Sequence, residues 1–413
     1  MRRRDFSQLM LCGLLHPILG RGEQALAAGP DPVKVGILHS LSGTMSLSEK
    51  WLKDVAVMTI GQINANGGIL GRLIQPVVID PASNWAIYPA KAERLIREHE
   101  VQAIFGCWTS ISRKRVLPVV ESNKSLLFYP VQYEGQEQSP NIVYLGATPN
   151  QQSLPAVRYF LKEHKATHFV LIGTDYVYPR TTNRILRAYL AGEGIASANI
   201  IEFYTPFSHT DYGPIVARIK AKTEGKDAVI ISTINGDSNV AFYAQLAAAG
   251  LHAETLPVVA FSIGEQEIQA MKSQDLKGHY AAWSYFMSLD NPVNQAFKDD
   301  WRRFLQQKYP WWAGEALTND PMEATYVGIH LWKQAVEQAG SFAPDAVIPA
   351  LGGQTFAAPS GYAVRVDARN HHLHKPVFIG RIGNDGQFDV VHQSHGLVPP
   401  EPWSHYLAEA PLA

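Results

Sequence analysis

The chain has 413 residues, of which 46% are hydrophobic, and a formal net charge of -1. This length and apolar content suffice for two sizeable domains. The nearly balanced charge gives no electrostatic footprint for a nucleic acid or an acidic membrane surface, and no apolar run in the sequence reaches the length of a membrane span.

The first 27 residues have the pattern of an export signal. Arginines at 2–4 precede a short, weakly apolar stretch at 9–19, and Ala-Leu-Ala at 25–27 offers a small-residue cleavage site. Arg-Arg-Asp-Phe at 3–6 is similar to the twin-arginine signal. We therefore expect export to the periplasm by that route; a cytosolic chain with a frayed N-terminus is the alternative.

Cysteine usage fits this expectation. Cleavage would remove Cys12 and leave Cys107, so we expect no internal disulfide in the mature chain. Cys107 follows an apolar strand and is expected to be a small buried side chain. A catalytic thiol is the alternative, although no histidine lies near it in the sequence.

A first series of alternating strands and helices begins at residue 33. We predict strands at 34–38, 76–79, 101–106, 125–128 and 141–146, and helices at 46–63, 89–98 and 112–121. Ser46 and Glu49 have the spacing of a capping box, which would open the first helix.

The pattern then restarts. We predict helices at 151–162, 181–191, 213–222 and 239–249, with strands at 168–173, 199–204, 227–233 and 256–261. Two later helices, at 294–308 and 320–339, are expected to return to the first lobe, and a β-hairpin is expected from 361–367 and 376–391 with its turn at 384–386. The alternation predicts an α/β fold with two lobes, each built on a parallel sheet covered on both faces.

Two loops follow strands in the first series. Trp108, Thr109 and Ser110 precede a helix, and an aromatic-polar segment occupies 129–135. In open α/β sheets, ligands bind beyond the carboxyl ends of the strands. Neither loop carries a nucleophile with an adjacent base or a set of metal ligands, and the chain contains no G-x-S-x-G, H-E-x-x-H or P-loop motif. We therefore expect a site that holds a small molecule, not an enzyme, and no cofactor or metal.

Several motifs together resemble one family. FGCWTS (105–110), LLFYPVQYEG (126–135), GTDYVYPR (173–180) and NGDSNVAFY (235–243) are similar to those of type I periplasmic solute-binding proteins of the branched-chain amino acid and amide group. Within that family, the chain most resembles urea-binding subunits of ABC transporters, and next the amide-sensing regulators of amidase operons. The resemblance extends from about 33 to about 391.

The resemblance implies two Rossmann-like lobes joined by a three-stranded hinge that closes over a ligand in the cleft. It implies a small neutral ligand, urea or a short amide, and an ABC permease of the inner membrane as partner. The expected division is 31–147 with 283–356 for the first lobe and 148–282 with 357–395 for the second, followed by a C-terminal tail at 396–413.

Urea and small amides need donors for their oxygen, acceptors for their N–H groups and close walls. The Ser110 hydroxyl and the backbone N–H groups at that helix start can donate to the oxygen, and aromatic rings can form flat walls. Asp237 and Glu267 are candidate acceptors. The resemblance places the following residues in the pocket: Trp108, Thr109, Ser110, Tyr129, Gln132, Tyr133 and Tyr176.

Alternatives stay open for these residues and for the function. Ser110 as a helix cap, the tyrosines as ordinary packing, and the two carboxylates as solvated loop groups are the plainer interpretations. His371, His372 and His374 are expected to lie in a solvated connection. A cytosolic amide sensor, an amino acid-binding protein and an amide hydrolase using Cys107 are the alternative functions.

Overall fold

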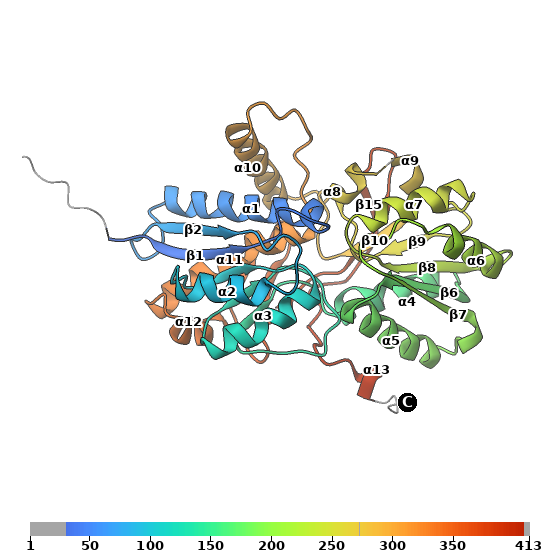
Figure 1. Cartoon of the computed structure of the whole chain (residues 1–413), viewed down its shortest axis with the longest axis horizontal. Coiled ribbons are helices and arrows are strands. Elements are labelled where there is room, and N and C mark those ends of the chain that lie inside the picture. Colours follow the sequence, from blue (N-terminus) through green and yellow to red (C-terminus); the bar gives the residue numbers. More distant parts are fainter. Residues whose placement is uncertain (1–29, 272, 409–413) are drawn as a thin grey trace, which may run out of the picture.

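The computed structural model describes residues 30–271 and 273–408 (Figure 1). The expected export signal, with Cys12, lies outside the described residues. Two lobes lie side by side, and each is built on its own sheet with helices on both faces. The predicted α/β class is confirmed.

The first lobe is formed by the first series of strands together with three helices from late in the chain, one of which, α10 (Pro292–Lys308), places Phe297, Trp301 and Leu305 in its core. Its other elements are β1 (Val33–Leu38), α1 (Ser46–Ala65), β2 (Ile74–Ile79), α2 (Tyr88–Arg97), β3 (Ile104–Gly106), α3 (Ser110–Ser122), β4 (Leu127–Tyr129), β5 (Ile142–Tyr144), α11 (Asp320–Ala339) and α12 (Pro344–Leu351). The strands are all parallel, in the order β2-β1-β3-β4-β5. Successive strand residues face opposite sides, so Phe105 packs against Trp332 of α11, whereas Ile104 lies in the other core.

The second lobe is formed by the second series. Its elements are η1 (Pro149–Gln151), α4 (Ser153–Glu163), β6 (His168–Thr174), α5 (Val177–Gly192), η2 (Ser197–Asn199), β7 (Ile200–Thr205), α6 (Gly213–Thr223), β8 (Ala228–Thr233), α7 (Ser238–Ala248), β9 (Val258–Ala260), α8 (Glu265–Gln269), α9 (Ser273–Leu276), β10 (Tyr280–Trp283), β14 (Phe378–Ile382) and β15 (Phe388–Gln393). The sheet order is β15-β14-β10-β9-β8-β6-β7, and the β14–β15 hairpin adds the antiparallel edge. A short helix, α13 (His405–Ala408), packs on α5 through the rings of Tyr406 and Tyr189.

A small third sheet differs from expectation. It consists of β11 (Thr355–Ala357), β12 (Ala363–Val366) and β13 (Leu373–His374), and it is antiparallel. Residues 361–367 therefore do not pair with 376–391, although the hairpin turn at 384–386 lies where it was predicted. Val364, Val366 and Leu373 share a core with β1 and α11. We propose that the chain returns to the second lobe near Lys375, later than the expected boundary at 357.

The start of α1 also differs from expectation. The helix begins at Ser46 without a side-chain cap, and Glu49 does not complete a capping box. Instead, the buried Glu49 carboxylate accepts a hydrogen bond from Ser40 N at 2.8 Å and lies 3.2 Å from His39 Nδ1. Tertiary contacts therefore hold this carboxylate in the interior, and it does not bind the backbone at the start of the helix.

The chain passes between the lobes after β5, after β10 and before β14, and buried polar contacts join these three segments. Lys375 Nζ donates to the Leu145 carbonyl at 3.0 Å and lies 3.7 Å from the Asp320 carboxylate. Asp320 in turn accepts from Ser284 N at 2.9 Å. All three crossing segments thus meet at one buried ion pair.

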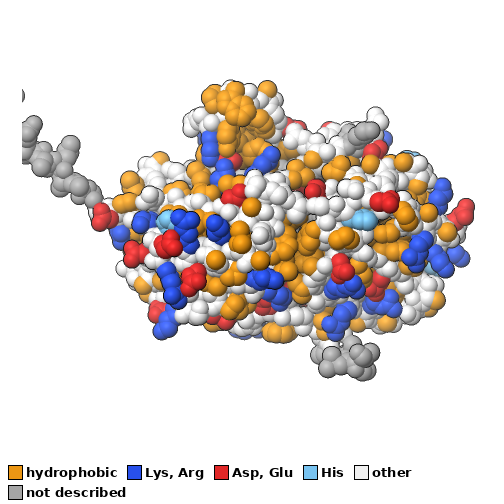
Figure 2. All heavy atoms as spheres, in the orientation of Figure 1, with side chains coloured by type: hydrophobic (Ala, Val, Ile, Leu, Met, Phe, Trp, Pro, Cys, Tyr) orange, Lys and Arg blue, Asp and Glu red, His pale blue; other side chains and the backbone are white. Residues whose placement is uncertain are grey.

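The surface agrees with the near-neutral composition. On the face shown in Figure 2, positive and negative side chains are interspersed over both lobes. Apolar side chains crown the projection formed by α10 (Pro292–Lys308) and the loop after it, where Trp311 is 79% exposed. Among the described residues, no helix has the length and apolar character to cross a membrane.

We expect the buried Glu265 to make stability fall as pH rises. Its carboxylate accepts from Met287 N at 2.7 Å, and burial raises the pKa of Glu265 from 4.5 to about 8. Between those values the folded chain keeps a proton that the unfolded chain has released, so the free energy of unfolding falls across this window, by an amount on the order of a few kcal/mol. Glu265→Gln retains an acceptor for Met287 and should remove this part of the slope.

The measurement is the free energy of unfolding at about pH 5 and about pH 8.5 for the wild type and the variant. Glu224→Gln, at an exposed position at the end of α6, is the matched control and should keep the wild-type slope. An unchanged slope in Glu265→Gln would contradict the assignment.

Candidate ligand-binding cleft

The loop between β3 and α3 lies at the carboxyl end of the first sheet. Trp108, Thr109 and Ser110 are 3%, 1% and 1% exposed. The Thr109 side chain accepts a hydrogen bond from Ser112 N at 3.2 Å and is the N-cap of α3. Thr109, rather than Ser110, therefore caps the helix, which leaves the Ser110 hydroxyl for other contacts. Cys107, just before this loop, is free and buried as expected.

The Ser110 hydroxyl is joined to two charged residues that the sequence interpretation missed. It donates to Glu134 Oε2 at 2.5 Å and accepts from Arg113 Nη1 at 3.2 Å. The Arg113 guanidinium is fully buried and lies 4.7 and 4.5 Å from the ring centroids of Tyr129 and Tyr133. Such placement satisfies a buried cation by both ion pairing and aromatic faces.

The charges at this wall balance. Arg113 Nε donates to Glu137 Oε1 at 2.7 Å and Nη2 to Glu134 Oε1 at 3.4 Å, while Lys114 Nζ donates to Glu137 Oε2 at 2.7 Å. Burial by itself would raise the pKa of Glu137, but Arg113 and Lys114 outweigh it and lower that pKa to about 2. Two cations are thus matched by two carboxylates, Glu134 and Glu137.

Tyr129 and Tyr133 have different surroundings. The Tyr129 hydroxyl donates to the Trp108 carbonyl at 2.6 Å and so joins the two loops. The Tyr133 hydroxyl instead lies 3.0 Å from the Glu137 carbonyl and 2.5 Å from His372 Nε2. Tyr133 therefore supports the loop from behind.

His372 does not lie in a solvated connection, so that expectation is wrong. It is fully buried, with its ring stacked on Tyr144 at 4.2 Å, and burial lowers the pKa of His372 to about 3. The return of β13 to the first lobe explains this burial, because an isolated bridge pairs His372 with Tyr144 at the end of β5.

Gln132 reaches across the cleft to the second lobe. Its side-chain nitrogen donates to the Phe261 carbonyl at 2.5 Å and to Ser262 Oγ at 3.1 Å, both just after β9. Its side-chain oxygen and the hydroxyl of Tyr178 are buried without a hydrogen-bond partner among the described residues. Burial raises the pKa of the Tyr178 hydroxyl, whereas the side chains of Gln132 and Ser262 lower it, so these polar groups lie next to one another at the junction of the lobes.

Tyr176 faces the first lobe from the opposite side. It is the residue before α5. Burial raises the pKa of the Tyr176 hydroxyl well above its usual range, and the neighbouring Tyr129, Tyr178 and Glu134 raise it further. The contacts between the two loops and across the lobe junction thus connect Trp108, Ser110, Tyr129, Gln132 and Tyr176 with Glu134, Arg113 and Tyr178.

Asp237 and Glu267, the two expected acceptors, each accept a hydrogen bond from a side chain of the other lobe. Asp237 is exposed and accepts from Thr44 Oγ1 at 2.7 Å and from Ser208 Oγ at 3.2 Å. Glu267 is buried and accepts from Ser48 Oγ at 2.6 Å and from Gly264 N at 2.9 Å. Thr44 and Ser48 belong to the first lobe, so each carboxylate ties one lobe to the other. The rings of Trp85 and Phe207, 5.4 Å apart, add an apolar contact between the lobes.

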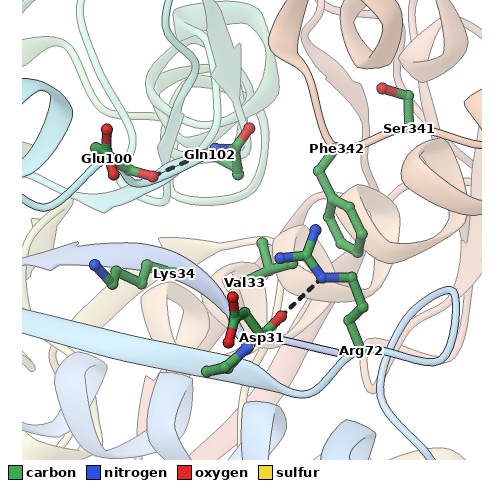
Figure 3. Close-up of a pocket in the computed structure, with 9 residues that line it drawn as sticks. Asp31, Val33, Lys34, Arg72, Glu100, Gln102, Ser341 and Phe342 are labelled. Atoms are coloured by element: carbon green, nitrogen blue, oxygen red, sulfur yellow. Dashed lines mark hydrogen bonds between the residues drawn. The ribbon is translucent and has the colours of Figure 1, made fainter. Parts of the chain in front are cut away.

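A cavity elsewhere in the first lobe is not the candidate site. Its volume is about 790 Å³, and it lies at the amino ends of the strands, where Arg72 Nε donates to the Asp31 carbonyl at 2.8 Å (Figure 3). Ligands of α/β sheets bind at the opposite edge. Asp31 also adjoins residues outside the described part of the chain.

Gly236 provides a test of the closed arrangement. Its φ is +70°, and a Cβ there would lie 2.3 Å from Met45 Cε and 3.0 Å from the Thr44 carbonyl of the other lobe. Gly236→Ala should therefore push the lobes apart and increase the radius of gyration measured by small-angle X-ray scattering. Gly250→Ala is the matched control, because φ there is +72° but nothing lies within 4 Å. Both variants carry backbone strain of about 1–2 kcal/mol; equal radii in the two would contradict the steric account.

Comparison with known proteins agrees with this architecture. Of the curated relatives, the leucine-, isoleucine-, valine-, threonine- and alanine-binding protein of Pseudomonas aeruginosa is 21% identical over 83% of this chain and 88% of its own length. A limonene hydroxylase of Geobacillus stearothermophilus is 34% identical, but the match covers only 32% of this chain and 23% of that protein.

Among solved structures, the solute-binding protein of an ABC transporter from Rhodopseudomonas palustris HaA2, in complex with p-hydroxybenzoic acid, has a TM-score of 0.76 and 24% identity. That match covers 90% of this chain and 99% of the other, and it shows the shared fold. A family model described as a periplasmic binding protein domain matches residues 33–409. The chain therefore belongs to the periplasmic binding protein family.

Proposed function

We propose that the chain is the solute-binding subunit of an ABC importer, which captures urea or a short aliphatic amide between its lobes and delivers it to an inner-membrane permease. The family, the two-lobed fold and the solved relative described as an ABC transporter solute-binding protein support the general role. The expected export signal at 1–27 supports a periplasmic location.

The pairing of Arg113 and Lys114 carries the proposal of an uncharged ligand. A carboxylate ligand needs cationic or several convergent donors. Both cations at the first-lobe wall are already joined to Glu134 and Glu137. A neutral amide needs only a donor for its oxygen and acceptors for its N–H groups, which Tyr178 and the Gln132 side-chain oxygen can supply.

The expected site residues then divide by role. Trp108, Tyr129 and Tyr176 form flat walls against a planar ligand, while Ser110 and Gln132 arrange its polar contacts. Thr109 caps α3, and Tyr133 supports the loop from behind. Asp237 and Glu267 act in lobe closure, through Thr44 and Ser48.

An amino acid ligand is the second candidate. The Pseudomonas aeruginosa relative is described as binding leucine, isoleucine, valine, threonine and alanine, and Glu134 could pair with a ligand ammonium. The ligand carboxylate would then have to be held at the start of α3, where the Thr109 and Ser110 hydroxyls are already engaged. A cytosolic amide sensor on the same fold is a third candidate, which retention of the leader in the cell would favour.

Isothermal titration calorimetry tests the proposal. We expect the purified protein to bind urea or acetamide without releasing ammonia, and to bind leucine and p-hydroxybenzoate at least about tenfold more weakly, a difference of about 1.4 kcal/mol. Binding of leucine or of the benzoate alone would overturn the ligand assignment. Release of ammonia would instead favour the amide hydrolase alternative.

A further inference from the structure

Glu134 stands apart from the other carboxylates of the first lobe. It is 1% exposed, and Ser110 and Arg113 hold its two oxygens from the side of α3. Its neighbours in the loop point in different directions: Tyr133 contacts His372 behind the loop, whereas Gln132 crosses to Phe261 of the second lobe. Burial raises the pKa values of Tyr176 and Tyr178 in the second lobe, and the charge of Glu134 raises them further, so Glu134 lies near the junction of the lobes.

Two further polar groups, one from each lobe, lie at the junction of the lobes. The Tyr178 hydroxyl and the Gln132 side-chain oxygen are both buried, in side chains that are each 3% exposed, and neither has a partner among the described residues. A buried polar atom without a partner is destabilising unless a ligand or water satisfies it. Together with the Glu134 carboxylate, these atoms offer one donor and two acceptors across the lobe junction.

We infer that Glu134 is the specificity-determining residue of this cleft, accepting the N–H groups of the bound molecule and excluding carboxylates. This inference rests on the proposed function and deepens it, since it names the group that recognises the amide nitrogen. Ser110 and Arg113 are positioning residues, because each donates a hydrogen bond to the Glu134 carboxylate and so fixes the orientation of that carboxylate.

The balance of charge explains why an uncharged ligand is preferred. Arg113 and Lys114 compensate Glu134 and Glu137, so an added anion or cation would remain uncompensated in a buried site. Acetamide, acetate and acetamidinium have nearly the same planar shape and differ in charge. We therefore expect the wild type to bind acetamide more tightly than either ion.

Glu134→Gln tests the contact directly. The variant keeps the volume and an oxygen for Ser110, but it removes an anionic acceptor and leaves Arg113 with excess positive charge. We expect acetamide or urea to bind at least about tenfold more weakly, as for loss of a hydrogen bond to a charged group. The preference should shift toward acetate.

Glu137→Gln is the matched control. It removes the same charge from the same arginine, but Glu137 contacts Tyr144 and Lys114 instead of Ser110. Because the same positive charge is left uncompensated, acetate should gain affinity in this variant as well, whereas the affinity for acetamide should stay at its wild-type value. Thermal unfolding of both variants reports whether each is folded, and Glu134→Asp, which keeps the charge but withdraws the oxygens, provides a second variant that should also weaken acetamide binding.

The outcomes are distinguishable. The inference is overturned if the wild type binds acetamide but Glu134→Gln binds it equally well, or if Glu137→Gln weakens acetamide binding as much as Glu134→Gln. It is also overturned if the wild type prefers acetate or acetamidinium. If the wild type binds neither acetamide nor urea, the proposed function itself fails.

Discussion

The rest of the cleft depends on the burial of one cation, the guanidinium of Arg113. A charge with no exposure to water is strongly unfavourable unless partners compensate it. Here Glu134 and Glu137 supply the opposite charge, and the rings of Tyr129 and Tyr133 supply negative faces. Each partner comes from the end of β4 or from the segment after it, so pairing with Arg113 of α3 fixes that loop against the helix.

This pairing extends beyond the wall of the cleft. Tyr144 donates to Glu137, and its ring stacks on His372 of the small third sheet. The segment from late in the chain thereby becomes part of the support behind the site. Removal of any one partner would leave a buried charge or polar group unsatisfied, which explains why the packing around the loop is so closely determined.

Two kinds of polar contact join the lobes, a buried ion pair and single hydrogen bonds from hydroxyl groups. Lys375 and Asp320 hold the crossing segments together at the hinge, whereas Asp237 and Glu267 join the lobes at the other side through single hydroxyl groups of Thr44 and Ser48. Contacts of the second kind are few and individually modest, so a ligand that adds even a few hydrogen bonds across the junction can shift the balance between open and closed forms. The proposed capture and release of a ligand by hinge motion requires contacts of this kind.

Local patterns were reliable wherever neighbours along the chain decide the structure. The helix at 320–339 was predicted with its exact bounds, because Asn319 accepts from Met322 N at its start and Gly340 ends it in the left-handed conformation. The hairpin turn at 384–386 and the burial of Cys107 have equally local causes. The predicted capping box of Ser46 and Glu49 does not form, because the Glu49 carboxylate contacts Ser40 and His39 instead, and both lie outside its helix.

The sequence by itself determined the α/β class, the alternation of strands and helices, and the two loops that enter the cleft, since periodicity and strand-end position depend on residues close together. Only the tertiary structure decided which partners the side chains of those loops contact. Ser110 meets Glu134 from 24 residues away, and Ser48 meets Glu267 across 219 residues. Such pairings have no local signature in the sequence, because they depend on how the folded lobes bring together residues that are far apart along the chain.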